Sequence, residues 1–170
     1  MVRLASNPDN FTYLESCQPK PPDIVIGDAR LTLAKEPNGA FDLLIVDAFT
    51  SDAVPIHLMT AEALRLYLAK TSPNGAAVLH ISNRYLDLDS VLAATVKLVP
   101  GAQGIIVADD DADGGYSATS STIAIFTKSE AALAPFRTMK GARDLVSKNL
   151  RPWTDDYSDI IGPFLSRLRE

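Results

Sequence analysis

Three aspartates stand at or just after the ends of apolar segments, where a carboxylate could meet a bound ligand. Asp28 follows the run at 24–26, Asp47 ends the run that begins at Phe41, and Asp52 lies in the loop beyond it. A carboxylate can hold a cationic amine, orient it and accept its proton. Asp47 is the leading catalytic candidate, because the apolar residues before it predict a partly desolvated carboxylate directed toward a ligand.

Each of these aspartates also has an ordinary structural interpretation. Asp28 is suited to capping the helix expected after it, and it could also accept a bond from an adenine amino group while the backbone amide of Ala29 faces a ring nitrogen. Asp47 could bond to loop amides, and Asp52 belongs to a residue type common in turns. The residue types alone leave both interpretations open.

A second group of candidates lies near the C-terminus. Residues 153–157 combine two aromatic rings with two adjacent carboxylates. Trp153, Asp155, Asp156 and Tyr157 could therefore bind an alkylammonium ion by ion pairing and cation–π contact. The alternative is a C-terminal segment that a single tryptophan anchors to the core.

The sequence shows no motif for a metal or for a hydrolytic serine. His57 and His80 are not spaced as a ligand pair, and the acidic stretch at 109–115 lacks the glutamate that completes a calcium loop. A Gly-x-Ser-x-Gly motif is also absent. His80 stands inside a predicted strand, where a histidine is more often a satisfied core residue than a catalyst. We therefore expect no metal.

The overall charge limits the classes of partner. The 170 residues carry a formal net charge of −5, which argues against binding to nucleic acid or an anionic membrane and favours a cationic small molecule. Cys17 is the only cysteine, which excludes an internal disulfide and fits a reducing compartment. No apolar run approaches the roughly 20 residues that span a bilayer. A cytoplasmic protein is expected.

Alternating strands and helices are expected to position these residues. Strands are predicted at 23–27, 41–47, 76–82, 105–108 and 119–127, and helices at 29–36, 60–70, 86–99, 129–136, 144–149 and 162–169. This order predicts a single α/β domain over residues 1–170, less regular from 137 to 170, with a mainly parallel, doubly wound sheet and an antiparallel strand near its C-terminal edge. Ligands bind beyond the carboxyl ends of such strands, which selects Asp28, Asp47 and the pair Ser82 and Asn83.

Several motifs, taken in order, resemble the spermidine synthase-like proteins. They are Gly27-Asp28-Ala29-Arg30, the run from Phe41 to Phe49, the segment from Ser51 to Leu58, His80-Ile81-Ser82-Asn83-Arg84-Tyr85 and Trp153-Thr154-Asp155-Asp156-Tyr157-Ser158. The likeness covers nearly the whole chain. It implies a Rossmann-like fold of class I methyltransferase type that binds S-adenosyl compounds. In the active enzymes, it implies transfer of an aminopropyl group from decarboxylated S-adenosylmethionine to putrescine.

The resemblance also implies roles for individual residues. Asp28 and Ala29 would contact adenine, Asp47 would be the catalytic aspartate, and Ala48 would lie beside the cofactor with it. Asp52 would replace the second, amine-binding aspartate, although the family's Asp-x-x-Asp spacing is stretched here. The attacking nitrogen, with a pKa of about 10, must first lose a proton, which a nearby carboxylate assists. No metal is required, because the departing thioether is neutral.

The front of the chain departs from this family. No Gly-x-Gly pattern precedes Asp23, so the glycine-rich turn that approaches the nucleotide and the acid that bonds the ribose are missing. In the methyltransferase-like strand order, the missing strands lie between segment 23–27 and the strand that ends at Asp47. Their loss predicts a gap in the sheet, which favours a homo-oligomer such as a dimer, or a shortened sequence.

Three functions are compatible with these residues. The leading one is an aminopropyltransferase domain of polyamine biosynthesis, complete only with an upstream segment or a partner chain. The second is a methyltransferase that uses S-adenosylmethionine itself. The third is a non-catalytic remnant or interaction domain of the same fold.

Overall fold

The computed structural model describes residues 2–16, 20, 22–48, 55–109 and 120–169. The chain divides into two compact units, Met1–Thr32 and Leu33–Glu170. The first contains two short helices, α1 (Val2–Ala5) and α2 (Tyr13–Ser16), and α3 (Ala29–Leu33) begins near its end.

The strand predicted at 23–27 is wrong. Residues 22–26 form neither helix nor strand, and the side chains of Ile24, Val25 and Ile26 are exposed. A β-branched run becomes a strand only when another strand pairs with its backbone, and none of the described strands pairs with this one.

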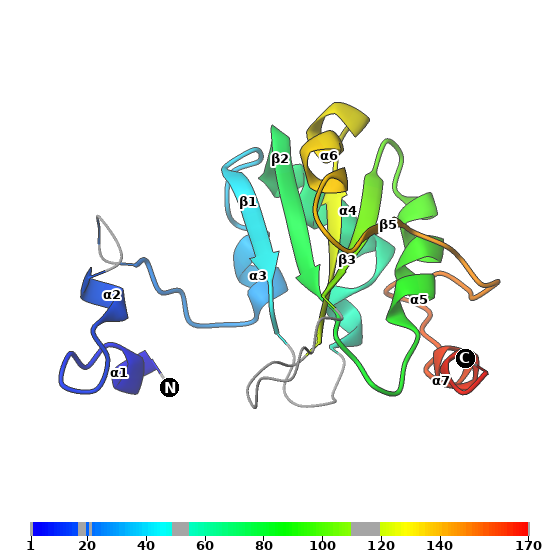
Figure 1. The fold of residues 1–170 in the computed structure, drawn as a ribbon. Coiled ribbons are helices and arrows are strands. Elements are labelled where there is room, and N and C mark those ends of the chain that lie inside the picture. Colours follow the sequence, from blue (N-terminus) through cyan, green and yellow to red (C-terminus); the bar gives the residue numbers. More distant parts are fainter. Residues whose placement is uncertain (1, 17–19, 21, 49–54, 110–119, 170) are drawn as a thin grey trace. The chain divides into compact units, whose positions relative to one another are not determined.

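The second unit is built on a five-stranded sheet, shown in Figure 1. Its strands are β1 (Phe41–Val46), β2 (Thr71–His80), β3 (Gln103–Asp109), β4 (Ser121–Thr127) and β5 (Ala142–Asp144). They lie in the order β1-β2-β4-β3-β5. β1 pairs with β2 in parallel, and the other three pairings are antiparallel, so β1, β2 and β3 share one direction that β4 and β5 oppose.

This arrangement confirms the predicted α/β sheet of methyltransferase type. The antiparallel strand β4 follows β3 in sequence but lies between β3 and β2. The helix predicted at 144–149 is wrong, because the short strand β5 ends at Asp144 and residues 145–148 form neither helix nor strand. Asp144 pairs with Ile105 of β3, and this pairing holds the backbone extended where local helix propensity would have curled it.

The helices begin and end close to the predicted positions. They are α4 (Ala61–Lys70), α5 (Leu88–Thr95), α6 (Glu130–Arg137) and α7 (Ile161–Arg167), with 3₁₀ helices η1 (Ile56–Leu58) and η2 (Val96–Leu98). The hydroxyl of Thr60 accepts a bond from the backbone N–H of Ala63 at 3.2 Å and so caps the N-terminus of α4. Asp87 and Ser129 cap α5 and α6 in the same way.

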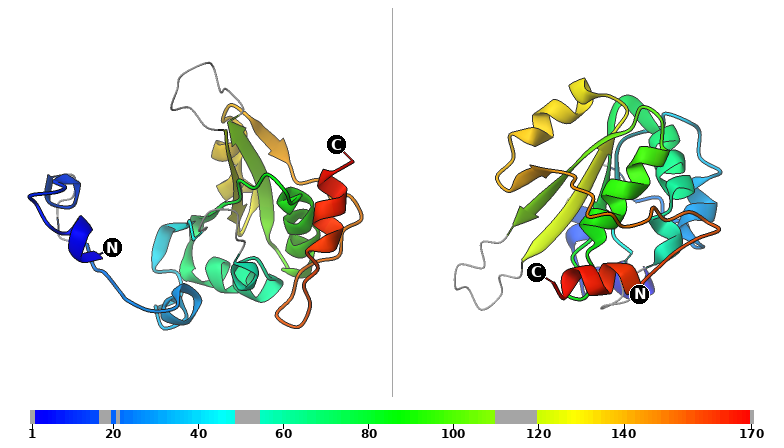
Figure 2. Two further views of the ribbon diagram at one scale, coloured as in Figure 1. Left: turned by 90° about the horizontal axis from the view of Figure 1, so that it is seen from below. Right: turned by 90° about the vertical axis from the view of Figure 1, so that its right-hand side faces the viewer.

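Helices cover both faces of the sheet, as Figure 2 shows. On one face α4 and α5 pack against the sheet around Leu64, Tyr67 and Phe126. On the other face α6 places Leu133 in a smaller cluster of β-branched residues from β3 and β4. Because both faces are covered at the centre of the sheet, its strands are apolar on both sides there.

β1 forms one edge of this sheet and is covered only in part. Its alternate residues Leu44 and Val46 pack toward the core, whereas the side chains of Leu43 and Ile45 are 53% and 63% exposed. On the side away from β2, no described strand pairs with it. The sequence predicted a gap between the segment at 23–27 and this strand, which is wrong: residues 22–26 form no strand, and β1 is an edge of the described sheet.

A bulge interrupts the pairing of β1 with β2 near the start of both strands. Phe41 pairs with Thr71 but Leu43 pairs with Ala76, so the four residues 72–75 of β2 lie opposite the single residue Asp42 of β1. The hydroxyl of Ser72 bonds to Oδ1 of Asp42 at 2.8 Å within this bulge. Beyond it, the register runs without interruption from Leu43 to Val46.

Candidate functional site

The register of β1 and β2 brings Asp47 beside His80. Val46 pairs with Leu79, so the next residues along the two parallel strands are neighbours at the carboxyl end of the sheet. Nδ1 of His80 lies 3.0 Å from Oδ1 of Asp47. The aspartate selected from the sequence therefore contacts the histidine that the sequence analysis assigned to the core.

A chain of hydrogen bonds continues from this pair to β4. Nε2 of His80 lies 2.8 Å from the hydroxyl of Ser82. The same hydroxyl oxygen accepts a bond from the backbone N–H of Thr122 at 2.8 Å. Asp47, His80 and Ser82 are thus linked to a backbone group of the neighbouring strand.

Strand alternation places these three side chains on one face of the sheet. Residues 76, 78, 80 and 82 share one face of β2 and its extension, and Leu79 and Ile81 point into the main core. The side chain of His80 is 32% exposed and that of Asp47 is 65% exposed. The expectation of a partly desolvated Asp47 is wrong, since this carboxylate lies beyond the strand end where solvent reaches it.

A small apolar pocket adjoins the pair. Its lining residues are Val46, Ala48, Pro55, Leu58, Met59, Leu79, His80 and Ile81. Ala48, which the sequence predicted to lie beside the cofactor, is the residue after Asp47 and lines this pocket. Its volume of about 10 Å³ is roughly that needed by one water molecule, so the pocket alone does not accommodate a larger ligand.

Asp28 caps α3, as one of its two interpretations predicted. Its Oδ1 accepts a bond from the backbone N–H of Leu31 at 2.9 Å, and its carbonyl accepts one from Thr32. Ala29 is the first residue of that helix. Both residues belong to the first unit, and their contact with adenine stays a prediction.

Trp153 is fully buried in the main core of the second unit. Its indole N–H donates to the carbonyl of Asp159 at 3.2 Å, and its backbone N–H donates to the hydroxyl of Thr95 at 3.0 Å. This burial favours the anchoring role over a cation–π contact with a ligand.

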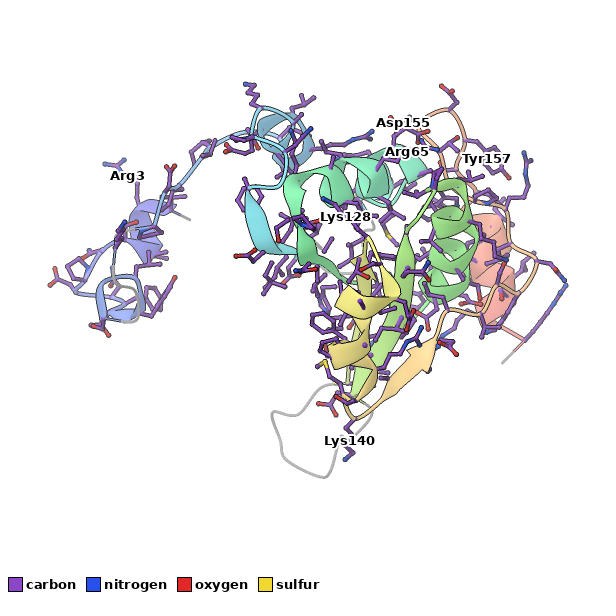
Figure 3. All side chains as sticks on the ribbon, turned by 90° about the horizontal axis from the view of Figure 1, so that it is seen from above. Arg3, Arg65, Lys128, Lys140, Asp155 and Tyr157 are labelled. Carbon is purple, nitrogen blue, oxygen red and sulfur yellow. The ribbon has the colours of Figure 1, made fainter. Side chains whose placement is uncertain are left out.

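Asp155 and Tyr157 lie in the same connection between β5 and α7, and Figure 3 labels both. Oδ1 of Asp155 accepts a bond from the hydroxyl of Thr60 at 2.7 Å, at the start of α4. The guanidinium of Arg151 lies 3.9 Å from the centre of the Tyr157 ring. The cation–π contact expected for Tyr157 is therefore made, but with a cation of the protein itself.

The remaining candidates are placed as follows. Asp156 is exposed in the turn between Asp155 and Tyr157. Asp52 lies outside the described residues. Within the described ranges, no group of three or more histidine, cysteine or acidic residues could hold a metal ion.

His80 is the site residue that the sequence analysis missed. The signal that could have found it was its position: it lies near the carboxyl end of a predicted strand adjacent to the one that ends at Asp47. Two residues at the ends of neighbouring parallel strands meet when the register matches. The register cannot be obtained by counting residues from the start of each strand, because the bulge at 72–75 shifts it.

No protein-family model matches the sequence, and no curated protein matches it. Among solved structures, a probable spermidine synthase from Corynebacterium glutamicum ATCC 13032 is similar over 80% of this chain and 55% of its own, with a TM-score of 0.53 and 16% identity. The spermidine synthase from Thermotoga maritima is similar over 94% and 50%, with a TM-score of 0.49 and 15% identity. A spermidine synthase in complex with the transition state analogue AdoDATO covers the same shares, with a TM-score of 0.48 and 14% identity.

The chain has a spermidine synthase-like fold, which is the fold that the sequence motifs implied. It spans about half the length of the solved structures that it resembles. Within the residues that the structure describes, no helix is both long enough and apolar enough to cross a membrane.

Proposed function

We propose that this chain is an aminopropyltransferase domain that moves an aminopropyl group from decarboxylated S-adenosylmethionine to a diamine such as putrescine. The observation that carries the proposal is the carboxylate of Asp47, which stands at the carboxyl end of β1 and is held there by His80. A spermidine synthase-like fold supports the same reaction class. The formal charge of −5 suits a cationic acceptor.

The proposed reaction forms a C–N bond and breaks a C–S bond. An acceptor ammonium gives one proton to Asp47 and becomes a neutral amine, whose lone pair attacks the carbon beside the sulfonium. The electron pair of the C–S bond goes to sulfur, which leaves as a neutral thioether. A carboxylate positioned next to the acceptor contributes by orienting the amine and taking its proton.

Roles for the other residues follow the resemblance. In this proposal Asp28 and Ala29 contact the adenine of the donor, and Ala48 adjoins the donor beside Asp47. Asp52 and the exposed Asp156 attract the distal ammonium of the diamine. Asp155 and Tyr157 are assigned to the same amine-binding role, although both already contact residues of the chain.

The proposal includes a second copy of the chain. The open edge of β1, with Leu43 and Ile45 exposed, is the kind of edge that pairs with another strand. Pairing of two β1 strands about a two-fold axis would extend the sheet and satisfy the unpaired backbone groups of this edge. We place the resulting homodimer in the cytoplasm, in agreement with its single cysteine.

Donor titrations test the proposal directly. The purified chain is titrated by calorimetry with decarboxylated S-adenosylmethionine and with methylthioadenosine, and products are analysed after incubation with putrescine. Formation of spermidine, lost in Asp47→Asn, is the expected result. Methylated product from S-adenosylmethionine, with no spermidine, would instead establish the methyltransferase alternative.

The non-catalytic alternative predicts a third outcome. Neither donor would bind or shift the thermal midpoint, and Asp47→Asn would change no property other than stability. Binding of donor with retained activity in Asp47→Asn would show that the fold is correctly interpreted but that the catalytic residue is another one.

A further inference from the structure

The side chain of Asp47 lies beyond the end of its strand and is largely exposed, so packing alone does not fix the direction of its carboxylate. The contact with Nδ1 of His80 engages Oδ1. Among the described residues, Oδ2 has no hydrogen-bond partner. We propose that His80 is a positioning residue that fixes the carboxylate of Asp47 and leaves Oδ2 directed at the ammonium of the acceptor, an inference that rests on the proposed function.

The hydrogen-bonding capacity of the three side chains sets the direction of the contacts. An ionised carboxylate can only accept, so Nδ1 of His80 carries the proton and donates to Asp47. In the neutral ring, Nε2 then accepts from the hydroxyl of Ser82. That hydroxyl accepts in turn from the N–H of Thr122. In this arrangement the Nδ1–H of His80, the Ser82 hydroxyl and the Thr122 N–H each have an acceptor, which is the tautomer that the proposal requires.

The chain is anchored in the rigid part of the sheet. His80 is the last residue of β2 and pairs with Ile123 of β4, and the backbone N–H of Ile81 donates to the carbonyl of Thr122 at 2.9 Å. The side chain of Ile81 is buried in the core. The backbone of His80 is therefore fixed by the sheet, and its ring is held through Nε2 by Ser82. A ring fixed in this way can orient the exposed carboxylate of Asp47 through Nδ1.

The same three residue types form the catalytic triads of serine hydrolases, which would make Ser82 a nucleophile. The structure favours an anchoring role, because the Ser82 oxygen already accepts the N–H of Thr122 at 2.8 Å. An ester substrate distinguishes the two roles. If the wild-type chain hydrolyses p-nitrophenyl acetate and Ser82→Ala abolishes this activity, the positioning role is overturned.

Substitutions of His80 that retain only one of its two hydrogen-bonding nitrogens test the positioning role. The amide N–H of His80→Asn takes the place of Nδ1 and can still donate to Asp47, whereas that of His80→Gln takes the place of Nε2 and reaches toward Ser82. With putrescine as acceptor, we expect kcat to fall by about 10- to 100-fold in His80→Ala and His80→Gln. His80→Asn should recover most of this loss, with the KM for the donor unchanged in all three.

Equal losses in His80→Asn and His80→Gln, matched by equal losses in thermal midpoint, would overturn the proposal, since only a general structural role predicts them. A second measurement does not depend on activity. Nitrogen NMR of the imidazole should show a protonated Nδ1 in the wild-type chain at pH 7 and a shift of this signal in Asp47→Asn.

The two measurements separate the two proposals. A chain that makes no spermidine but shows the Nδ1–H tautomer, perturbed by Asp47→Asn, would refute the proposed reaction and retain the positioning of Asp47 by His80. A proton on Nε2 alone, or an NMR signal unaffected by Asp47→Asn, would refute the positioning whatever the activity.

Discussion

Ser166 of α7 donates its hydroxyl proton to Oδ2 of Asp87 at 2.7 Å, which joins the last helix of the fold to the residue that caps α5. The same oxygen accepts from the hydroxyl of Ser90 at 2.9 Å and lies 3.2 Å from the ammonium of Lys148. The side chain of Asp87 is only 4% exposed. One buried carboxylate therefore holds three segments of the chain together.

The ionisation of Asp87 should make stability depend on pH in the acid range. Burial raises its pKa, but the hydrogen bonds from Ser166 and Ser90 and the Lys148 ammonium lower it more, so the net pKa lies below the ordinary value. A carboxyl group whose pKa is lowered by folding stabilises the folded state at pH values above its unfolded-state pKa of about 3.9. This stabilisation is lost as the pH falls through the pKa of the folded state. Acid unfolding of the wild-type chain below about pH 4 should therefore include this group.

Asp87→Asn measures that contribution. Asparagine keeps the cap of α5 but removes the charge, so unfolding by urea at pH 7 should require about 1.5–3 kcal/mol less. The difference from wild type should vanish at a pH below the folded pKa. Asp89→Asn is the control, since Asp89 lies two residues further along, in the first turn of α5, and bonds to the half-exposed Arg143. An equal loss in both variants would contradict the assignment to Asp87.

Two glycines with nearly the same positive φ should respond differently to alanine. Gly101 and Gly141 have φ of 78° and 79°, where an L-residue costs about 1–2 kcal/mol. A Cβ on Gly101 would meet nothing within 4 Å, whereas one on Gly141 would lie 1.8 Å from the carbonyl oxygen of Ala108. In urea unfolding we expect about 1–2 kcal/mol for Gly101→Ala and about 2–5 kcal/mol for Gly141→Ala. Similar costs would show that the turn before β5 moves freely.

The tryptophan provides a test of the C-terminal segment. Trp153 is the only tryptophan and is fully buried, so its emission should be blue-shifted and should not change when putrescine is added. Trp153→Ala should lower the free energy of unfolding by about 3–5 kcal/mol. Quenching by putrescine in the native chain would restore the ligand-binding interpretation of this residue.

The open edge of β1 should control self-association. Ile45→Lys places a charge on the exposed face of the edge strand, which opposes strand pairing. We expect light scattering coupled to gel filtration to show a dimer for the wild-type chain and a monomer for Ile45→Lys. Ile161→Lys is the matched control, because Ile161 is also exposed but lies on α7. Dissociation by the control variant, or a monomeric wild-type chain, would place the interface elsewhere or remove it.

The helices that pack on the sheet were predictable because their signals are local. Thr60 precedes a helical run, and an N-cap acts on the backbone only three residues away. The strand ending at Asp47 could also be predicted, since a continuous apolar run is typical of a strand that is buried on both faces. Even so, Leu43 and Ile45 are exposed, because burial of β1 depends on neighbours that its own residues do not reveal.

The errors arose where a distant segment decides the outcome. Residues 24–26 have strand-forming side chains, but no described strand pairs with them. Asp144, where a helix was predicted to begin, instead ends β5 and pairs with Ile105 of β3. The pairing of Asp47 with His80 could not be read from spacing, since it depends on how many residues the bulge in β2 absorbs. Pattern alone identified Asp47, whereas its partner required the register.

That bulge also predicts where related sequences can vary in length. Pairing is continuous from Leu43 opposite Ala76 to Val46 opposite Leu79, so an insertion or deletion within 72–75 would leave Asp47 and His80 aligned. An insertion or deletion of one residue between Ala76 and His80 would turn the histidine side chain to the opposite face of the sheet. Homologues that keep the pair should therefore gain and lose residues at 72–75 and keep a constant length from 76 to 80.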